Sequence, residues 1–182
     1  AEENDITVLS DEIYIRFLYE GNHQSITKFP EMVDRTVILD GFSKTYAMTG
    51  WRIGYGLLPD NLVEPISRLV TNSVSCTASF TQKAALEALT GPQDDSAKMV
   101  KKFKKRRDIV VTGLNNISGI KCAIPKGAFY TFPNVEGTGL SSSDFANGLL
   151  EHAGVAVLSG ESFGKFGTGY VRISFANSTK NL

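Results

Sequence analysis

The sequence has few cysteines and histidines, and their placement excludes disulfide-rich and zinc-binding proteins. Only two cysteines, Cys76 and Cys122, occur in 182 residues, too few for a disulfide framework and without the close spacing of a zinc site. The two histidines, His23 and His152, have no partner at metal-ligand spacing. We therefore expect no metal site. We interpret the cysteines as small apolar groups in a protein of a reducing compartment, the cytoplasm.

The sequence also lacks an excess of charge and any long apolar run. Lys and Arg number 19, as do Asp and Glu, so the formal net charge is +0. A neutral chain lacks the positive field of a dedicated nucleic-acid binder. No apolar run approaches the roughly 20 residues of a membrane span, and no signal peptide opens the chain. We expect a soluble protein with no nucleic-acid or membrane partner.

Short apolar runs and helical periodicity alternate in the first half of the chain. The apolar runs predict strands at residues 6–9, 36–39 and 52–58. Apolar residues at helical spacing predict one helix from Pro59 or Asp60 and two more at residues 79–90 and 94–115. Near-continuous apolar strands beside helices favour an α/β layer structure over an antiparallel sandwich.

The second half of the chain mixes strands and helices without regular alternation. We expect strands at residues 120–123, 128–132, 155–158 and 170–175, and a helix that opens at Ser142 or Ser143. This pattern indicates a separate α+β unit. The start of the long helix marks the boundary, which divides the chain into domains at residues 1–94 and 95–182.

Residues 40–55 hold the strongest chemical signal in the sequence. There a predicted strand ends, the chain turns through small polar residues and presents Lys44, and Arg52 enters the next strand. Ligands bind at the carboxyl edge of α/β sheets. At such an edge a desolvated lysine becomes a nucleophile toward carbonyls, and an arginine suits a phosphate. From these residues alone, an exposed lysine and a solvated arginine remain the alternative.

This segment resembles the cofactor-lysine segment of the fold-type I aminotransferases, which use pyridoxal 5'-phosphate, in the branch of aspartate and aromatic aminotransferases. Gly-Trp-Arg-Ile-Gly at residues 50–54 matches the family's Gly-x-Arg-x-Gly, and the family's Ser-x-Ser-Lys is matched in part. Gly41 stands where many members have a phosphate-binding serine, whereas Ser43 is kept. The resemblance implies that Lys44 binds the cofactor and moves the catalytic proton, with Ser43 and Arg52 as further cofactor ligands.

Two other segments resemble the same family. Residues 10–14, Ser-Asp-Glu-Ile-Tyr, resemble its Asp-x-x-Tyr, which implies that Asp11 meets the pyridine nitrogen and Tyr14 the phenolic oxygen of the cofactor. A carboxylate there keeps the ring nitrogen protonated and the ring electron-withdrawing. Residues 169–175 resemble the segment whose arginine, here Arg172, binds the substrate α-carboxylate. The alternatives are a helix N-cap for Asp11 and a structural salt bridge for Arg172.

Over the whole chain, the resemblance implies an α/β fold: the C-terminal part of the family's large domain, with a mixed, mostly parallel sheet, and an α+β small domain. It implies a homodimeric transaminase that moves an amino group between an amino acid, of the aspartate/glutamate or aromatic type, and a 2-oxo acid in amino-acid biosynthesis. Cofactor ligands from the family's N-terminal half have no place in this sequence. We therefore expect the chain alone to be an inactive fragment, truncated at its end.

Two alternatives stay open. One is another enzyme on the same scaffold that uses the same cofactor, such as a carbon–sulfur lyase or a cyclopropane-forming synthase. The other is a non-catalytic module that keeps the fold.

Overall fold

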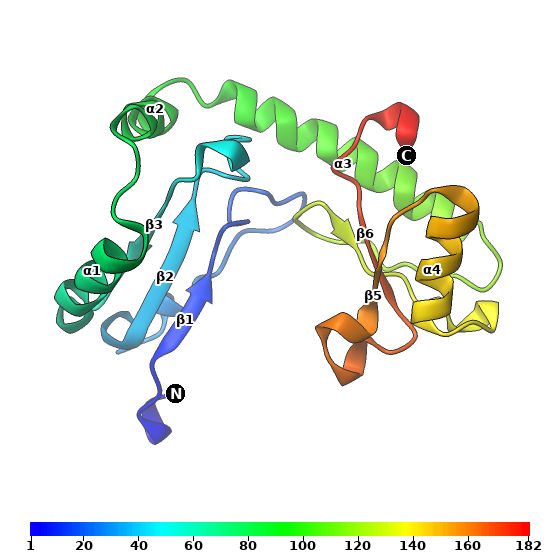
Figure 1. The fold of residues 1–182 in the computed structure, drawn as a ribbon, viewed down its shortest axis with the longest axis horizontal. Helices are drawn as coiled ribbons and strands as arrows, with labels where there is room; N and C mark the ends of the chain where they lie inside the picture. The colour runs from blue at the N-terminus through cyan, green and yellow to red at the C-terminus, as the bar shows by residue number, and fades with distance from the viewer. The chain divides into compact units, whose positions relative to one another are not determined.

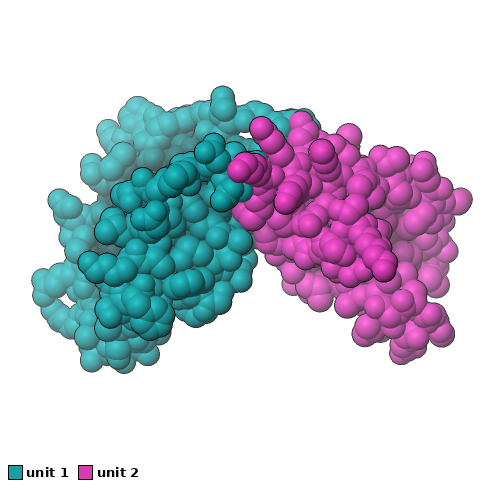
Figure 2. Space-filling view, turned by 90° about the horizontal axis from the view of Figure 1, so that it is seen from above, with its two compact units in different colours: residues 1–97 teal, residues 98–182 magenta.

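The computed structural model describes residues 1–182 and divides into two compact units (Figure 2). The first unit comprises residues 1–97 and the second residues 98–182. Both units combine helices with a small sheet, so the expected mixed α/β fold is confirmed (Figure 1). No helix combines the length and the apolar character that crossing a membrane requires.

The first unit is built on a three-stranded sheet of β1 (Val8–Asp11), β2 (Thr36–Gly41) and β3 (Gly54–Leu57). β1 runs parallel to β2, with Asp11 paired to Leu39. β3 runs antiparallel to β2, with Gly54 paired to Gly41. All three predicted strands are thus confirmed with small shifts at their ends, and the sheet is mixed.

Three helices follow this sheet along the chain: α1 (Asp60–Val74), α2 (Ser79–Thr90) and α3 (Asp94–Asn115), which continues into the second unit. α2 and α3 have the predicted bounds, because Gly91 and Pro92 terminate α2 and the acidic first turn of α3 suits the helix dipole. The core of the unit lies where the turn after β2 packs on α2. Phe42, Met48 and Ala85 meet there and are 3 to 8% exposed.

The second unit contains β4 (Tyr130–Thr131), α4 (Ser142–Ala153), β5 (Leu158–Ser159) and β6 (Val171–Ser174). β6 is the central strand and pairs antiparallel with β4 and β5. α4 begins where the sequence predicts, because Ser141 Oγ accepts a hydrogen bond from the Asp144 N–H at 3.1 Å. β6 also carries Val171, one of the fully buried side chains of the unit.

The predicted strand at residues 120–123 is wrong. Only Lys121 forms a β-bridge there, with Asn134. The side chain of Asn115 instead hydrogen-bonds to the backbone N–H and carbonyl of Cys122. Its Oδ1 accepts from the Cys122 N–H at 2.8 Å, and its Nδ2 donates to the Cys122 carbonyl at 2.9 Å. These bonds use the backbone groups that a neighbouring strand would need.

Short 3-10 turns connect the longer elements. They lie at Glu2–Asn4, Ile26–Lys28, Val33–Arg35, Thr49–Trp51, Glu136–Thr138, Gly160–Phe163, Lys165–Gly167 and Thr179–Asn181. The turn at Thr49–Trp51 matters most for the site, because it separates the Lys44 turn from Arg52.

Candidate active site

The sheet of the first unit brings the chemical residues of three segments to one edge. β1 and β2 are parallel, so their carboxyl ends, at Asp11 and Gly41, lie at the same edge (Figure 1). β3 is antiparallel to β2, so its amino end, which follows Arg52, lies there too. The edge therefore collects Asp11, the Lys44 turn and Arg52, as the sequence predicts for a ligand site of an α/β sheet.

The turn that carries Lys44 is held by its own backbone and by apolar anchors. The Phe42 carbonyl accepts from the N–H groups of Tyr46 at 3.2 Å and Met48 at 3.3 Å. The buried side chains of Phe42 and Met48 fix both ends of the turn in the core. Between these anchors, Ser43 and Lys44 are half-buried. The fold thus presents Lys44 on a constrained turn between two buried anchors.

Arg52 occupies a left-handed backbone conformation, with φ of 53°, directly before β3. Its Nη1 donates to the Thr49 carbonyl at 2.8 Å, which closes the 3-10 turn. Arg52 also lines a cavity of about 900 Å³ together with Trp51, Thr77 and Phe80, which come from the turn before β3 and from the α1–α2 region. The guanidinium is exposed, and its remaining N–H groups can donate to other partners. Few non-glycine residues adopt the backbone conformation of Arg52.

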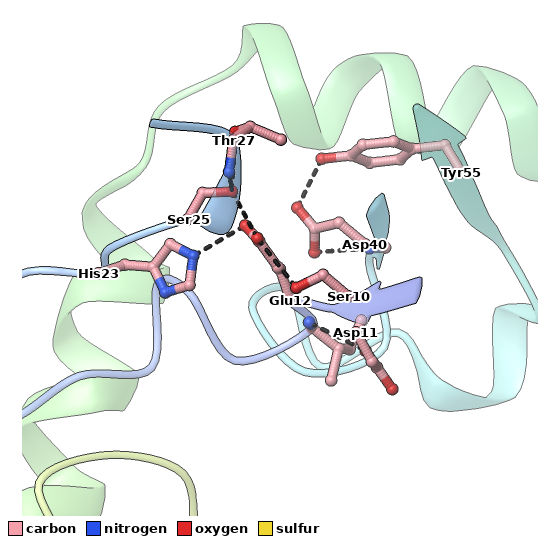
Figure 3. Close-up of polar contacts among 10 residues, drawn as sticks. Ser10, Asp11, Glu12, His23, Ser25, Thr27, Asp40 and Tyr55 are labelled. Atoms are coloured by element: carbon pink, nitrogen blue, oxygen red, sulfur yellow. Dashed lines mark hydrogen bonds and ion pairs between the residues drawn. The ribbon is translucent and has the colours of Figure 1, made fainter. Parts of the chain in front are cut away.

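Asp11 ends β1 and uses one carboxylate oxygen within the protein. Its Oδ1 accepts from the Ile13 N–H at 3.2 Å in a local turn (Figure 3). No helix begins there, so the helix N-cap interpretation of Asp11 is wrong. Its Oδ2 has no protein partner, and the residue is exposed. Tyr14 lies in the same turn, half-buried, with its ring edge-on to the buried ring of Phe17 at 6.3 Å.

A buried carboxylate beside Asp11 is a feature that the sequence did not reveal. Glu12 is 6% exposed, and its Oε1 accepts from Ser25 at 2.7 Å and from Ser10 at 3.2 Å. His23 Nε2 lies 2.7 Å from its Oε2 (Figure 3). Burial raises the pKa of Glu12, but the bonds from Ser25, His23 and Ser10 and the charge of His23 outweigh it and leave the pKa below its ordinary value. This cluster ties the loop after β1 to the strand end that carries Asp11.

A second polar pair joins β2 to β3. Asp40 and Tyr55 are cross-strand partners, and the Tyr55 hydroxyl donates to Asp40 Oδ2 at 2.6 Å (Figure 3). The other oxygen of Asp40 accepts from the Gly41 N–H at 2.7 Å. Burial, followed by the hydrogen bond to Asp40, raises the pKa of Tyr55 to about 12. The pair fixes the strand end from which the Lys44 turn departs.

Close approach of the neighbouring strand explains why position 41 is a glycine. A Cβ at Gly41 would lie 2.9 Å from the Gly54 Cα and 3.2 Å from the Ile53 carbonyl oxygen. A Cβ at Gly54 would in turn lie 3.0 Å from the Asp40 carbonyl oxygen. β2 and β3 therefore approach too closely for a side chain at position 41, where many members of the resembling family have a serine.

Arg172 lies on β6 of the second unit and is half-buried. It makes no ion pair or hydrogen bond within the protein, so the structure contains no salt bridge of the kind that the alternative interpretation requires. Its guanidinium instead lies over the rings of Tyr130 and Phe163. The N–H donors of Arg172 therefore have no acceptor within this chain and can bind an anion from outside it.

The structure brings a lysine turn, an arginine and the carboxylate at the end of the neighbouring strand to one edge of an α/β sheet, the arrangement that the resemblance to aminotransferases implies. The family model "Aminotransferase class I and II" matches residues 1–182. The chain belongs to this family.

The curated relatives and solved structures agree with this family. An aspartate aminotransferase of Pyrococcus horikoshii is 45% identical over all of this chain and 47% of its own length. The aromatic-amino-acid aminotransferase 2 of Thermococcus litoralis is 41% identical over the same shares. The crystal structure of an aromatic aminotransferase from Pyrococcus horikoshii superposes with a TM-score of 0.94 at 40% identity, over 99% of this chain and 48% of that one. The chain thus spans about half the length of the relatives it matches.

Proposed function

We propose that this chain is the C-terminal part of a transaminase that moves an amino group between an amino acid and a 2-oxo acid with pyridoxal 5'-phosphate. The observation that carries the proposal is the shared sheet edge of Asp11, the Lys44 turn and Arg52. The aspartate and aromatic aminotransferases among the relatives favour an aspartate/glutamate or aromatic substrate.

The residues at this edge fit that cofactor chemically. An aldehyde requires a primary amine, which Lys44 supplies on a turn held by buried anchors. A phosphate requires a cation beside open space, and Arg52 lines the cavity of about 900 Å³. A protonated ring nitrogen requires a carboxylate oxygen that the protein does not use, and Asp11 keeps Oδ2 for it.

When bound, pyridoxal phosphate supplies an aldehyde that condenses with amines and a ring that withdraws electrons from the substrate α-carbon. Lys44 would hold this aldehyde covalently, and its amine, once free, would move the proton at the substrate α-carbon. Asp11 would keep the ring nitrogen protonated, and the Tyr14 hydroxyl would donate a hydrogen bond to the phenolic oxygen. Arg172 binds the substrate α-carboxylate through its unpaired N–H groups.

The phosphate is assigned to Arg52 and Ser43. Arg52 supplies the positive charge. Its exposed guanidinium donates from Nη1 to the Thr49 carbonyl, and its other nitrogen atoms can donate to the phosphate. Ser43 gives one hydroxyl from the Lys44 turn. Gly41 gives none, because the approach of β3 excludes a side chain there, so we propose that a backbone N–H replaces that contact.

The remaining assignments are also proposals. Residues 1–94 are assigned to the large domain and residues 95–182 to the small domain of the family. A homodimer would cover exposed apolar side chains of the first unit, such as Val74 at 71% and Phe80 at 70% exposure. Location in the cytoplasm and a role in amino-acid biosynthesis stay predictions.

The test is Lys44→Ala in the full-length protein, with Lys83→Ala, an exposed lysine on α2, as the matched control. The Lys83 variant should keep a visible absorbance band that borohydride bleaches, and mass spectrometry should locate the reduced cofactor on Lys44. The Lys44 variant should lose both signals. A band that persists in Lys44→Ala would contradict the assignment.

Activity separates the proposal from its alternatives. A transaminase needs a 2-oxo acid to convert its amino donor catalytically, whereas a carbon–sulfur lyase releases pyruvate and ammonia without one. Turnover of the full-length protein that is independent of any 2-oxo acid would favour a lyase or a cyclopropane-forming synthase. A protein without the bleachable band would be a non-catalytic module.

A further inference from the structure

The two faces of the β6 sheet differ in character. Val171, at 0% exposure, faces the core, and side chains alternate along a strand, so Arg172 and Ser174 share the opposite face. Tyr130 is the cross-strand partner of Ser174 and therefore lies on the same face as Arg172. The register thus brings an arginine and an aromatic ring together on the side of the sheet that is turned away from Val171.

Two aromatic rings contact the Arg172 guanidinium. Its Cζ lies 4.7 Å from the ring centroid of Tyr130 and 4.6 Å from that of Phe163, which belongs to the 3-10 turn after β5. Both distances are well within the range of a cation–π contact. Each of these rings contacts a further ring: Phe129 to Tyr130 at 4.8 Å and Phe132 to Phe163 at 5.9 Å. Phe132 itself stacks on Tyr170 at 5.3 Å.

The acidic side chains nearest in sequence to these rings have other partners. Glu161 accepts from Ser143 Oγ at 3.0 Å, and Glu136 accepts from Asn134 Nδ2 at 3.0 Å. Arg172 consequently has aromatic neighbours and no carboxylate. Because no carboxylate or carbonyl oxygen pairs with the guanidinium, its N–H donors stay without an oxygen partner in the protein.

We propose that Tyr130 and Phe163 are positioning residues, which hold the Arg172 guanidinium so that its N–H fork receives the α-carboxylate of the substrate. This inference rests on the proposed function, because it takes that carboxylate as the anion. The rings fix the side chain without neutralising it, whereas an acidic partner would fix it and compete with the substrate. Tyr130 acts through its ring and not through its hydroxyl.

The experiment measures binding of succinate, a carboxylate without an amino group, to the full-length holoenzyme by calorimetry. Phe163→Leu and Tyr130→Leu keep apolar volume but remove the ring. Each should weaken succinate binding by about three- to tenfold, the size of one partly exposed cation–π contact. Tyr130→Phe should retain the affinity. Phe166→Leu is the matched control, since this ring in the neighbouring turn is 88% exposed and contacts Lys165 but not Arg172.

Kinetics add a readout that a general loss of structure would not give. Every amino acid and oxo-acid substrate carries the carboxylate, so the ring variants should raise KM for both substrates by a similar factor and change kcat less. Phe163 is 50% exposed, so Phe163→Leu decides the question even if a Tyr130 variant does not fold.

The outcomes separate this inference from the proposed function. An Arg172→Gln variant with unchanged succinate affinity, or with unchanged KM for both substrates where the wild type does not bind succinate, would contradict the carboxylate role of Arg172 itself. If Arg172→Gln weakens binding but Phe163→Leu and Tyr130→Leu behave like Phe166→Leu, only the positioning role is wrong.

Discussion

The buried carboxylate of Glu12 gives the sharpest test of how the site is held. It accepts hydrogen bonds from Ser25 and Ser10 through Oε1 and contacts His23 through Oε2. Glu12→Gln keeps the Oε1 acceptor and the shape, and it removes the charge that His23 meets. Glu12→Ala removes all three contacts and leaves a small cavity.

The structure gives a magnitude for each variant. A hydrogen bond to a charged group is worth about 1.5–3 kcal/mol, but His23 is 33% exposed and water can replace part of its contact. We therefore expect Glu12→Gln to lower the free energy of unfolding by about 1–2 kcal/mol. Glu12→Ala leaves two hydroxyls and an imidazole without their acceptor and should cost about 3 kcal/mol.

The effect also has a defined pH dependence. The pKa of Glu12 is lowered in the folded state, so its stabilising contribution is complete above its ordinary value of 4.5 and is lost as the pH falls through the folded pKa. The stability difference between wild type and Glu12→Gln should therefore narrow below that pH.

Urea unfolding of the full-length protein across this range measures the Glu12 effect. Glu3→Gln, an exposed glutamate, serves as the control. A Glu12→Ala variant as stable as this control, or a difference that grows on acidification, would refute the reasoning.

Three further predictions concern the same framework. Tyr55→Phe should lower stability by about 1 kcal/mol through the lost bond to Asp40, and ultraviolet titration of wild type should show one tyrosine near 12 that the variant lacks. Gly41→Ala should cost about 2 kcal/mol in thermal unfolding, because its Cβ meets the β3 backbone at 2.9 Å, whereas Gly50→Ala meets open space. Cys122, whose thiol pKa is raised by burial, should react with thiol reagents only after denaturation.

The long elements could be predicted from the sequence because their ends carry local signals. Gly91 and Pro92 terminate α2, and acidic residues open α3, so both helices have the predicted bounds. The strand at residues 120–123 failed for the opposite reason. Its apolar run looks like a strand, but the side chain of Asn115 reaches the backbone of Cys122 and takes the place of a neighbouring strand.

The same distinction applies to the candidate site. Asp11 and the Lys44 turn follow the carboxyl ends of two strands, and parallel strands bring such ends to one sheet edge. Arg52 precedes a strand and reaches the same edge because β3 runs antiparallel to β2, a direction that the sequence does not reveal. No sequence pattern indicates the buried cluster around Glu12, because its partner His23 comes from a loop whose path depends on the folded structure.

Candidate ligand-binding residues at strand ends can thus be predicted from the sequence, whereas the residues that hold them in place depend on tertiary contacts. Glu12 beside Asp11 and the two rings around Arg172 belong to the second kind. The Glu12 carboxylate has partners on both oxygens and fixes the loop after β1, whereas the two rings contact the Arg172 guanidinium without accepting hydrogen bonds as a carboxylate would. If Arg172 receives the substrate carboxylate as proposed, its donors are oriented before the ligand arrives, which lowers the cost of ordering them on binding.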